Sequence, residues 1–406
     1  MLQYELKKKY NLCTYCLRRQ VVPIRKNTDR SYKKRKNTDR SYKKIKQSKS
    51  SNSNSCYVCR GIMSQLDSTV KKICTAIEAK EYQFDSFMLG ATLPLAVFER
   101  EDSIRSKFKV RGRENIKRQF LHELRKKLEK VTGKRVEHIT PDITIHIVID
   151  NQDTDGDTNN SNNYNNTLQQ TLSIKSSPIF FSGRYVKAIR GLPQKKDICQ
   201  KCLGSGCFSC DYKVVSPSDS IEAIISRRVL EITKGETPKF SWLGSEDKDS
   251  LVLGKGRPFL VRVSDPKVRW LKTDLTIKEN GVYAVIKQQS PQQRSFQLPS
   301  RFTTKTKITI QAERDLSSKS LPILLNVLEN SEVSFETKSR ILKKKIYSVE
   351  VEQIDQKAFI LTIVSDGGLF IKQFVGGQEY CEPNISKIIG MKCECVAFDV
   401  LKINTE

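Results

Sequence analysis

The sequence predicts a multidomain α+β protein, and three observations support this. The chain has 406 residues, enough for two or three domains that each bury a core. Its second half holds many short strand-like runs and few helical patterns, which is typical of an α+β domain with a mixed, largely antiparallel sheet. Between the halves, residues 151–169 are rich in Asn, Asp, Gln and Thr and lack the apolar content of a core. A domain boundary is therefore expected there.

The N-terminal segment contains two Cys-x-x-Cys pairs, Cys13 with Cys16 and Cys56 with Cys59. A basic insert separates the pairs, and in it the sequence Lys-Asn-Thr-Asp-Arg-Ser-Tyr-Lys-Lys occurs twice. Two copies of a polar unit are too few for a solenoid, so we expect a flexible loop that attracts phosphate. Paired thiolates are typical zinc ligands. We therefore predict that residues 1–65 form a zinc-binding segment that carries this insert.

Residues 66–150 are expected to form a small α/β module. Apolar residues at helical spacing from Leu66 to Ile77 indicate its first helix. Residues 113–131 form a second pattern, a basic amphipathic helix with one apolar stripe. The apolar run at 143–149 predicts a buried strand.

Residues 151–176 are expected to be a polar linker or loop, and residues 177–406 a second, strand-rich domain. Strand-like runs in that domain lie at 178–182, 258–263, 281–287, 306–311, 345–353, 358–364 and 395–403. Helical patterns lie near 219–232, 318–329 and 384–390. The excess of strands is the reason for the α+β prediction.

A second cysteine cluster lies early in that domain, formed by Cys199, Cys202, Cys207 and Cys210. Glycines between its pairs allow the chain to fold back, and four thiolates satisfy the tetrahedral geometry of Zn²⁺. We predict a structural zinc site here and hold the N-terminal pairs as a further one. Neither site would keep an open coordination position for water, so neither is expected to be catalytic.

The charge of the chain predicts a polyanionic partner. The formal net charge is +27 and the isoelectric point about 9.6, with the excess concentrated in the N-terminal segment. Lys and Arg release condensed counterions when they neutralise phosphates, so nucleic acid is the leading candidate. The sequence has neither a secretory signal pattern nor an apolar run of membrane-spanning length. We therefore expect a cytoplasmic protein without membrane contact. With only three histidines, we expect no histidine-based catalytic metal.

The most informative segment is Gly244–Phe259, in which an acidic turn precedes a strand-like run. Acidic turns alone are common and mostly solvated. This segment, however, resembles the active-site segment of the archaeal-type tRNA pseudouridine synthases that modify uridines 54 and 55, a THUMP-containing family. The match includes Glu246, Asp247, Asp249 and the Gly-Arg-Pro-Phe sequence that ends the segment. The resemblance implies that Asp247 is the catalytic aspartate.

Four other segments resemble the same family in the same order: Leu12–Gln20, Phe84–Gly90, Gly183–Gln194 and Gly368–Val375. The first is similar to a zinc element and the second to the THUMP-containing RNA-binding region. The resemblance therefore implies a THUMP-like RNA-binding module at 66–150 and a pseudouridine synthase catalytic domain at 177–406. It also implies tRNA as the partner, and no obligate protein partner is evident from the sequence.

The resemblance also implies a mechanism. Uridine isomerisation breaks the N1–C1′ bond and joins C5 to C1′, so catalysis needs no cofactor, and zinc would be structural. Asp247 would attack C1′ or remove a sugar proton, and Lys372 would keep it charged. The expected substrate-binding residues are Phe370, Ile371, Tyr347, Arg257, Arg184, Tyr185, Lys187 and Arg190. Phe370 and Tyr347 are candidates for stacking on the base. Arg184, Lys187 and Arg190 would contact phosphate, while Arg257 would brace the turn or touch RNA.

Two departures from the family pattern leave an alternative open. Ser245 and Leu251 stand where the family has arginines, and neither can make a bidentate phosphate contact. A catalytically weak or inactive tRNA-binding protein of the same fold is therefore the alternative hypothesis. A zinc-ribbon factor of the translation or transcription machinery would explain the cysteines and charge, but it leaves the C-terminal strands without a role.

Overall fold

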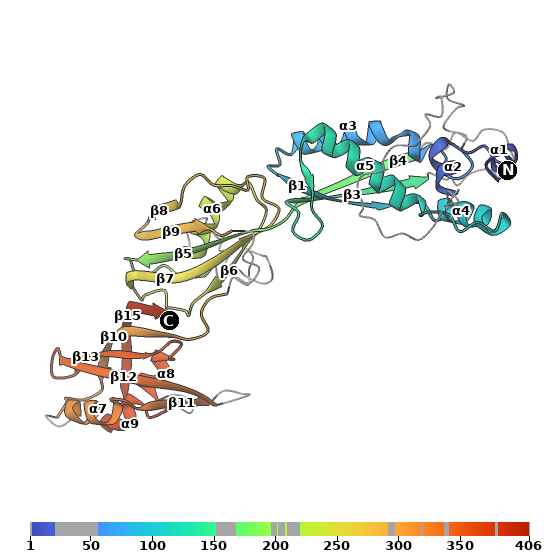
Figure 1. Ribbon diagram of the computed structural model, residues 1–406. Coiled ribbons are helices and arrows are strands. Elements are labelled where there is room, and N and C mark those ends of the chain that lie inside the picture. Colours follow the sequence, from blue (N-terminus) through green and yellow to red (C-terminus); the bar gives the residue numbers. More distant parts are fainter. Residues whose placement is uncertain are drawn as a thin grey trace, which may run out of the picture. The chain divides into compact units, whose positions relative to one another are not determined.

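Figure 1 shows the computed structural model of the chain, which divides into two compact units, Met1–Ser177 and Pro178–Glu406. The residues it describes are 2–20, 56–151, 168–195, 201, 208, 220–290, 297–317, 320–336, 341–377 and 381–405. The basic insert and the cluster of Cys199, Cys202, Cys207 and Cys210 lie outside the described residues. In the part of the chain that is described, no helix combines the length and apolar content needed to cross a membrane.

The first unit is a four-stranded sheet with helices, in the strand order β2-β1-β3-β4. Its elements are α1 (Leu2–Lys9), α2 (Thr14–Gln20), η2 (Ile62–Ser64), α3 (Leu66–Ala79), β1 (Ser86–Thr92), α4 (Leu95–Lys107), α5 (Ile116–Thr132), β2 (Arg135–Val136), β3 (Ile143–Asn151) and β4 (Leu168–Ser176). β1 is parallel to β2 and to β3, whereas β3 and β4 are antiparallel.

The helix expected at 113–131 is α5, and its limits follow from its end residues. The Asn115 side chain accepts a hydrogen bond from the Arg118 amide, which caps the N-terminus. Gly133, with a φ of 68°, ends the helix in the left-handed conformation. The predicted apolar stripe from Ile116 to Leu128 is buried. This stripe places α5 in the same core as α3 and the inner face of the sheet.

Residues 168–176, which we expected to lie in the polar linker, form β4 instead and pair with β3 along its length. The strand is largely polar because it is at the edge of the sheet. Of its described side chains, the apolar ones that pack on the core are Leu172 and Ile174, and most of the others are exposed. Two apolar positions are too short an alternation to distinguish such a strand from the polar residues before it.

The second unit is built on an 11-stranded sheet. Its elements are β5 (Ile179–Lys187), α6 (Ile221–Thr233), β6 (Pro238–Trp242), β7 (Val252–Val263), β8 (Leu275–Glu279), β9 (Val282–Gln288), β10 (Phe302–Ala312), α7 (Ser320–Leu328), β11 (Glu332–Glu336), β12 (Ile341–Gln353), β13 (Ala358–Asp366), α8 (Ile371–Gly376), β14 (Cys381–Glu382), α9 (Ile385–Ile389) and β15 (Cys393–Thr405). The strand order is β14-β11-β12-β13-β10-β15-β7-β5-β9-β8, and β6 pairs with β7. Only the β15–β7 pairing is parallel among these described strands, so the prediction of a mixed, largely antiparallel sheet is confirmed.

Two apolar cores lie on one face of this sheet. The first contains α6 with β5, β7 and β9, and the second contains α7, α8 and α9 with β10, β12 and β13. Val400 belongs to the first core, and Ile308 belongs to the second. Val400 is paired with Thr306, two residues from Ile308 on the same strand, so both cores share that face. The central strands β10, β15 and β7 run between them.

Candidate active site and candidate metal centre

A cavity of about 700 Å³ lies in the second unit, between the two cores. Asp247 and Lys372 are part of its wall, and five aromatic residues also line it: Phe240, Trp242, Phe302, Phe370 and Phe398. The volume falls within the range of about 300–1,000 Å³ that is typical of small-molecule sites. A cavity with an aromatic lining and a few charged groups can hold a planar, polar ligand such as a nucleobase.

Asp247 lies in the turn between β6 and β7. Its side chain is 31% exposed, and its Oδ1 accepts a hydrogen bond of 2.8 Å from the Lys248 amide. The Asp247 carbonyl accepts another from the Ser250 amide, which closes the turn. Gly244 opens the turn with a φ of 77°, and a Cβ there would lie 2.7 Å from the Arg257 guanidinium. Only glycine fits this position without strain.

Lys372 reaches the carboxylate from α8. Its Nζ forms an ion pair with Asp247 Oδ2, so the structure brings together the two residues that the sequence analysis paired. The hydrogen bond from Lys372 lowers the pKa of Asp247, and the same bond raises the pKa of Lys372. Asp247 is therefore a carboxylate, and Lys372 an ammonium, at neutral pH. Lys372 is 66% exposed, so solvent screens the pair and it adds little to stability.

A buried polar cluster lies beneath the turn. Arg257 Nε forms an ion pair of 2.6 Å with Glu246, and both side chains are at most 2% exposed. The Tyr185 hydroxyl donates a hydrogen bond of 2.5 Å to Glu246, and Gln194 donates one of 2.9 Å to the Tyr185 hydroxyl. Burial, followed by the charge of Glu246, raises the pKa of Tyr185, so its hydroxyl keeps the proton that it donates. These contacts fix the residue that precedes Asp247.

Arg257 and Lys187 hold the backbone of the same turn. Arg257 donates to the carbonyls of Leu243, at 2.7 Å, and Ser245, at 3.2 Å. Lys187 is fully buried, and its Nζ donates to the Asp247 and Lys248 carbonyls, each at 3.0 Å, and to the Leu192 carbonyl. Burial lowers the pKa of Lys187. Its ammonium therefore braces the turn and does not reach a phosphate, unlike the sequence expectation.

Arg184 and Arg190 lie apart from the cavity wall. Arg184 donates to the Gly256 carbonyl at 2.8 Å. Because it precedes Tyr185 on β5, its side chain projects from the face of the sheet opposite the one that carries Tyr185. Arg190 makes two hydrogen bonds of 2.8 Å to Asp399, and it also donates to the Asp249 carbonyl. Arg190 is 44% exposed, so it can still meet solvent or a ligand beside the turn.

The two aromatic residues expected to stack on a base differ in position. Phe370 is 44% exposed, lines the cavity and packs edge-on against Phe335. Ile371, the next residue, also lines the cavity. Tyr347 is not part of the lining; its hydroxyl donates a hydrogen bond of 2.9 Å to Asp366. Of the two, Phe370 has the better position for a base in this cavity.

Phe302 is a cavity residue that the sequence analysis missed. Its ring lies against two glycines that are far apart in the sequence. A Cβ on Gly367 would be 2.1 Å from Phe302 Cε2, and one on Gly244 would be 3.2 Å from Phe302 Cζ. The ring therefore separates the loop that carries Asp247 from the loop that leads to Lys372. The only sequence signal was a pair of glycines just before Phe370.

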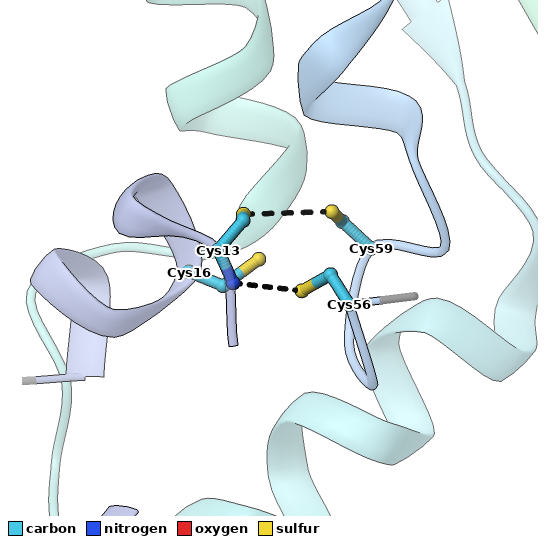
Figure 2. Close-up of side chains that lie close together, drawn as sticks. All are labelled: Cys13, Cys16, Cys56 and Cys59. Carbon is cyan, nitrogen blue, oxygen red and sulfur yellow. Dashed lines mark hydrogen bonds between the residues drawn. The ribbon is translucent and has the colours of Figure 1, made fainter. Parts of the chain in front are cut away.

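The candidate metal centre is in the first unit. Cys13, Cys16, Cys56 and Cys59 point toward one another, as Figure 2 shows, and their sulfur atoms all lie within 4.8 Å of one another. The Sγ atoms of Cys13 and Cys59 are 3.7 Å apart. Tetrahedral Zn²⁺ with Zn–S bonds of about 2.3 Å requires about 3.8 Å between sulfurs. The four thiols therefore have the spacing of a metal tetrahedron.

The surroundings of the thiols also suit a metal. Hydrogen bonds from Cys13 and Cys16 lower the pKa of Cys56, so part of the group is already inclined to be thiolate. Arg19, which is 1% exposed, donates to Cys16 Sγ at 3.5 Å. Arg19 also forms an ion pair with Glu101 of α4. A cation beside the sulfurs offsets the negative charge of a four-thiolate zinc site and orients its ligands.

Comparison with known proteins identifies the family. A family model described as "Pus10, C-terminal" matches residues 180–404, more than half of the chain. The chain belongs to the Pus10 family. A second model, described as "Pus10 THUMP domain, archaeal", matches residues 70–148. The resemblance stated from the sequence is therefore confirmed, and both Pus10 models fall where the sequence placed the corresponding segments.

The relatives of this Pus10 chain match it over most of its length. A protein named tRNA pseudouridine synthase Pus10 from Nitrosopumilus maritimus is 32% identical over 97% of this chain and 95% of its own. Proteins with the same name from Cenarchaeum symbiosum and Methanocaldococcus jannaschii are each 30% identical. They cover 87% and 86% of this chain, and 82% and 75% of their own.

Proposed function

We propose that this protein is a tRNA pseudouridine synthase that isomerises uridine 54, uridine 55 or both in the TΨC loop, with Asp247 as the catalytic aspartate. The observation that carries the proposal is the ion pair of Asp247 and Lys372 on the wall of an aromatic cavity. Membership of the Pus10 family supports it.

The reaction sets the demands on the site. The N1–C1′ bond of uridine breaks, the base turns, C5 bonds to C1′, and the C5 proton moves to N1. Composition does not change, so the enzyme is an isomerase. A carboxylate at C1′ either forms a covalent intermediate or removes a proton from the sugar. Asp247 is charged and faces the cavity, so it meets the requirement of both routes.

The buried groups around Asp247 preorganise the site. Arg257, Glu246 and Lys187 fix the turn before substrate arrives, so the carboxylate needs little rearrangement in the transition state. Lys372 keeps the carboxylate ionised when substrate displaces water from the cavity. The contacts give Arg257, Tyr185 and Lys187 positioning roles in place of direct contact with RNA.

The target uridine must leave its base stack to reach Asp247. Phe302 and Phe370 both line the cavity, and either ring can take the face of the extruded uracil. Neither carries a hydroxyl, so the base would be held by stacking and by polar groups of the lining. We assign Phe302 as the ring nearer the catalytic pair, because it lies between the two loops that hold Asp247 and Lys372.

Zinc has a structural role in this proposal. Four thiolates in tetrahedral spacing favour Zn²⁺ over harder cations, and four protein ligands leave no position for water. The ion would join the Cys13–Cys16 pair to the Cys56–Cys59 pair, two parts of the N-terminal segment that the basic insert separates in the sequence. The second cluster, Cys199 to Cys210, stays a prediction.

The inactive alternative is less favoured by the contacts of the turn. Ser245 offers its carbonyl to Arg257, and the Leu251 amide donates a hydrogen bond of 2.9 Å to Asp399. Both contacts use backbone atoms. The turn around Asp247 is therefore braced without the two arginines that the family has at these positions.

Conversion of unmodified tRNA tests the function. Purified protein is incubated with a tRNA transcript, and pseudouridine is mapped by position. We expect product at 54 or 55 that disappears in Asp247→Asn. Asp249→Asn is the matched control, because Asp249 belongs to the same turn but does not line the cavity. Product that survives Asp247→Asn, or tight tRNA binding without product in the wild type, would refute the proposal.

A further inference from the structure

The sheet of the second unit has a face opposite the catalytic cavity. Side chains alternate along each strand of β5 to β9. Those that lie between the buried ones therefore project from this opposite face. Phe180 is 39% exposed there, and Tyr283 is 50% exposed. We name this surface the outer face; its defining residues are Lys239, Arg262, Phe180, Tyr283 and Lys278.

Each exposed aromatic residue of the outer face has a cation directly opposite on the neighbouring strand. Phe180 is paired with Arg262, which is paired in turn with Lys239 of β6. Tyr283 is paired with Lys278 of β8. Directly paired side chains lie about 5 Å apart, so each ring has a positive group beside it. Tyr283 is paired with Val186 of β5, six residues after Phe180, so the two rings are about 20 Å apart at about 3.4 Å for each residue.

The outer face carries positive charge without compensation. Within β5, β6, β7, β8 and β9, all of them fully described, no outward side chain is a carboxylate. Asp274, just before β8, pairs with Lys287 at 3.3 Å. An unbalanced set of cations on a sheet face attracts a polyanion.

The same side of the sheet is balanced elsewhere, which makes the outer face distinct. On β10 and β15, Lys305, Lys307 and Lys402 leave this side. Carboxylates accompany them: Glu350 pairs with Lys305 at 3.2 Å, and Asp399 lies opposite Lys307. The positive charge is therefore concentrated on one half of the sheet and is not a general property of its solvent side.

We propose that the outer face is a second RNA-binding surface, which takes a single-stranded segment. Phosphates would meet the cations, and unpaired bases would stack on Phe180 and Tyr283. Charge complementarity favours RNA as the occupant, and the exposed rings favour a single strand, because bases in a duplex have no free face. The surface goes beyond the catalytic role of Asp247 and does not depend on it.

Binding of a uridine-free RNA 12-mer to the full chain tests the proposal, with fluorescence anisotropy at several salt concentrations. The test variant is Lys239→Gln/Arg262→Gln/Lys278→Gln. The control variant, Lys305→Gln/Lys307→Gln/Lys402→Gln, removes the same charge from the other half of the same side. For the test variant we expect the slope of log K against log salt to fall by about 2, at about 0.7 for each lost phosphate contact. The control should keep most of the wild-type slope.

Removal of a ring tests the stacking separately. Phe180→Ser and Tyr283→Ser are each expected to weaken binding of the single strand about fivefold or more. Their binding to a blunt RNA duplex should not change. Circular dichroism and thermal unfolding check that each variant is folded. Three outcomes would each overturn the proposal. They are an equal fall of the salt slope in the two triple variants, unchanged affinity in both ring variants, and displacement of the RNA by poly-glutamate at equal charge.

Failure of the outer-face proposal can be distinguished from failure of the catalytic assignment of Asp247. The probe contains no uridine, so Asp247→Asn is expected to bind it as the wild type does. If Asp247→Asn loses pseudouridine formation while the test variant binds the probe normally, only the outer-face proposal fails. If the test variant loses the probe while Asp247→Asn still forms pseudouridine, only the catalytic assignment fails.

Discussion

Gly367→Ala should disable the enzyme without touching a charged group. The added Cβ would lie 2.1 Å from Phe302 Cε2, whereas non-bonded carbons prefer about 3.5–4.0 Å. The ring must therefore move by about 1.4 Å or more, toward the loop of Gly244 on its other side. Gly367 does not have a positive φ, so the cost is steric. Overpacking of this kind costs about 1–3 kcal/mol of stability.

The substitution should lower the rate of pseudouridine formation much more than it lowers the stability of the fold. The displaced ring separates the loops that carry Asp247 and Lys372, and a misplacement of about 1 Å can reduce a rate about 100-fold. We expect a loss of this order in single-turnover pseudouridine formation, with only a modest fall in the urea midpoint. Gly390→Ala is the control, because its Cβ would meet open space and its only cost would be backbone strain, at a φ of 78°. Phe302→Leu in the Gly367→Ala background should recover part of the rate. A Gly367→Ala enzyme with wild-type rate would refute the steric reasoning.

Three further predictions concern the charged groups and the metal. Arg257→Met leaves the Glu246 carboxylate buried without its ion-pair partner, so we expect the free energy of unfolding in urea to fall by about 3–5 kcal/mol. Glu246→Gln in the same chain should restore part of this free energy. An unchanged urea midpoint would contradict the buried pair. Lys372 lowers the pKa of Asp247, so the charged, active form persists below the usual carboxyl value of about 3.9 and is lost only as pH falls through the lowered pKa. In Lys372→Met the acidic limb of the kcat/KM profile should therefore move to higher pH, whereas Lys248→Met should leave it in place. Cys56→Ser should lower the zinc content of the chain by about one equivalent, measured by atomic emission, and should lower the thermal midpoint of the first unit. Unchanged zinc content in the Cys56→Ser chain would count against the site.

The sequence predicted those elements whose buried face is apolar. α5 and β3 have clear stripes of leucine, isoleucine or phenylalanine, and both form where expected. α4 was not recognised because its buried face is partly ionic. Glu101 is 1% exposed there and pairs with Arg19 of α2, so the helix has few of the apolar positions that the periodicity test requires. A residue whose partner is distant in the sequence gives no local signal.

The site shows the same limit. Asp247 and Lys372 could be named because each belongs to a segment that resembles a known family, and no local pattern would have joined them. Lys187 was interpreted as a surface cation, since lysine is rarely buried. It is buried because its Nζ donates to three carbonyls, those of Asp247 and Lys248 in the turn and that of Leu192, and a buried ammonium requires such acceptors. The Phe302 ring lies against both Gly244 and Gly367, two residues that are far apart in the sequence and that only the fold brings together.

The parallel pairing of β7 with β15 determines how the two halves of the sheet are joined. The ladder between them consists of one residue pair, Val252 with Val400, whereas β10 and β13 share nine. Val400 also lines the cavity, so the two halves of the sheet meet beside it along a line with few backbone contacts. The ion pair of Arg190 and Asp399 also joins the two halves at this place. Side-chain contacts, and not a long strand ladder, therefore hold the two halves of the sheet together beside the turn of Asp247.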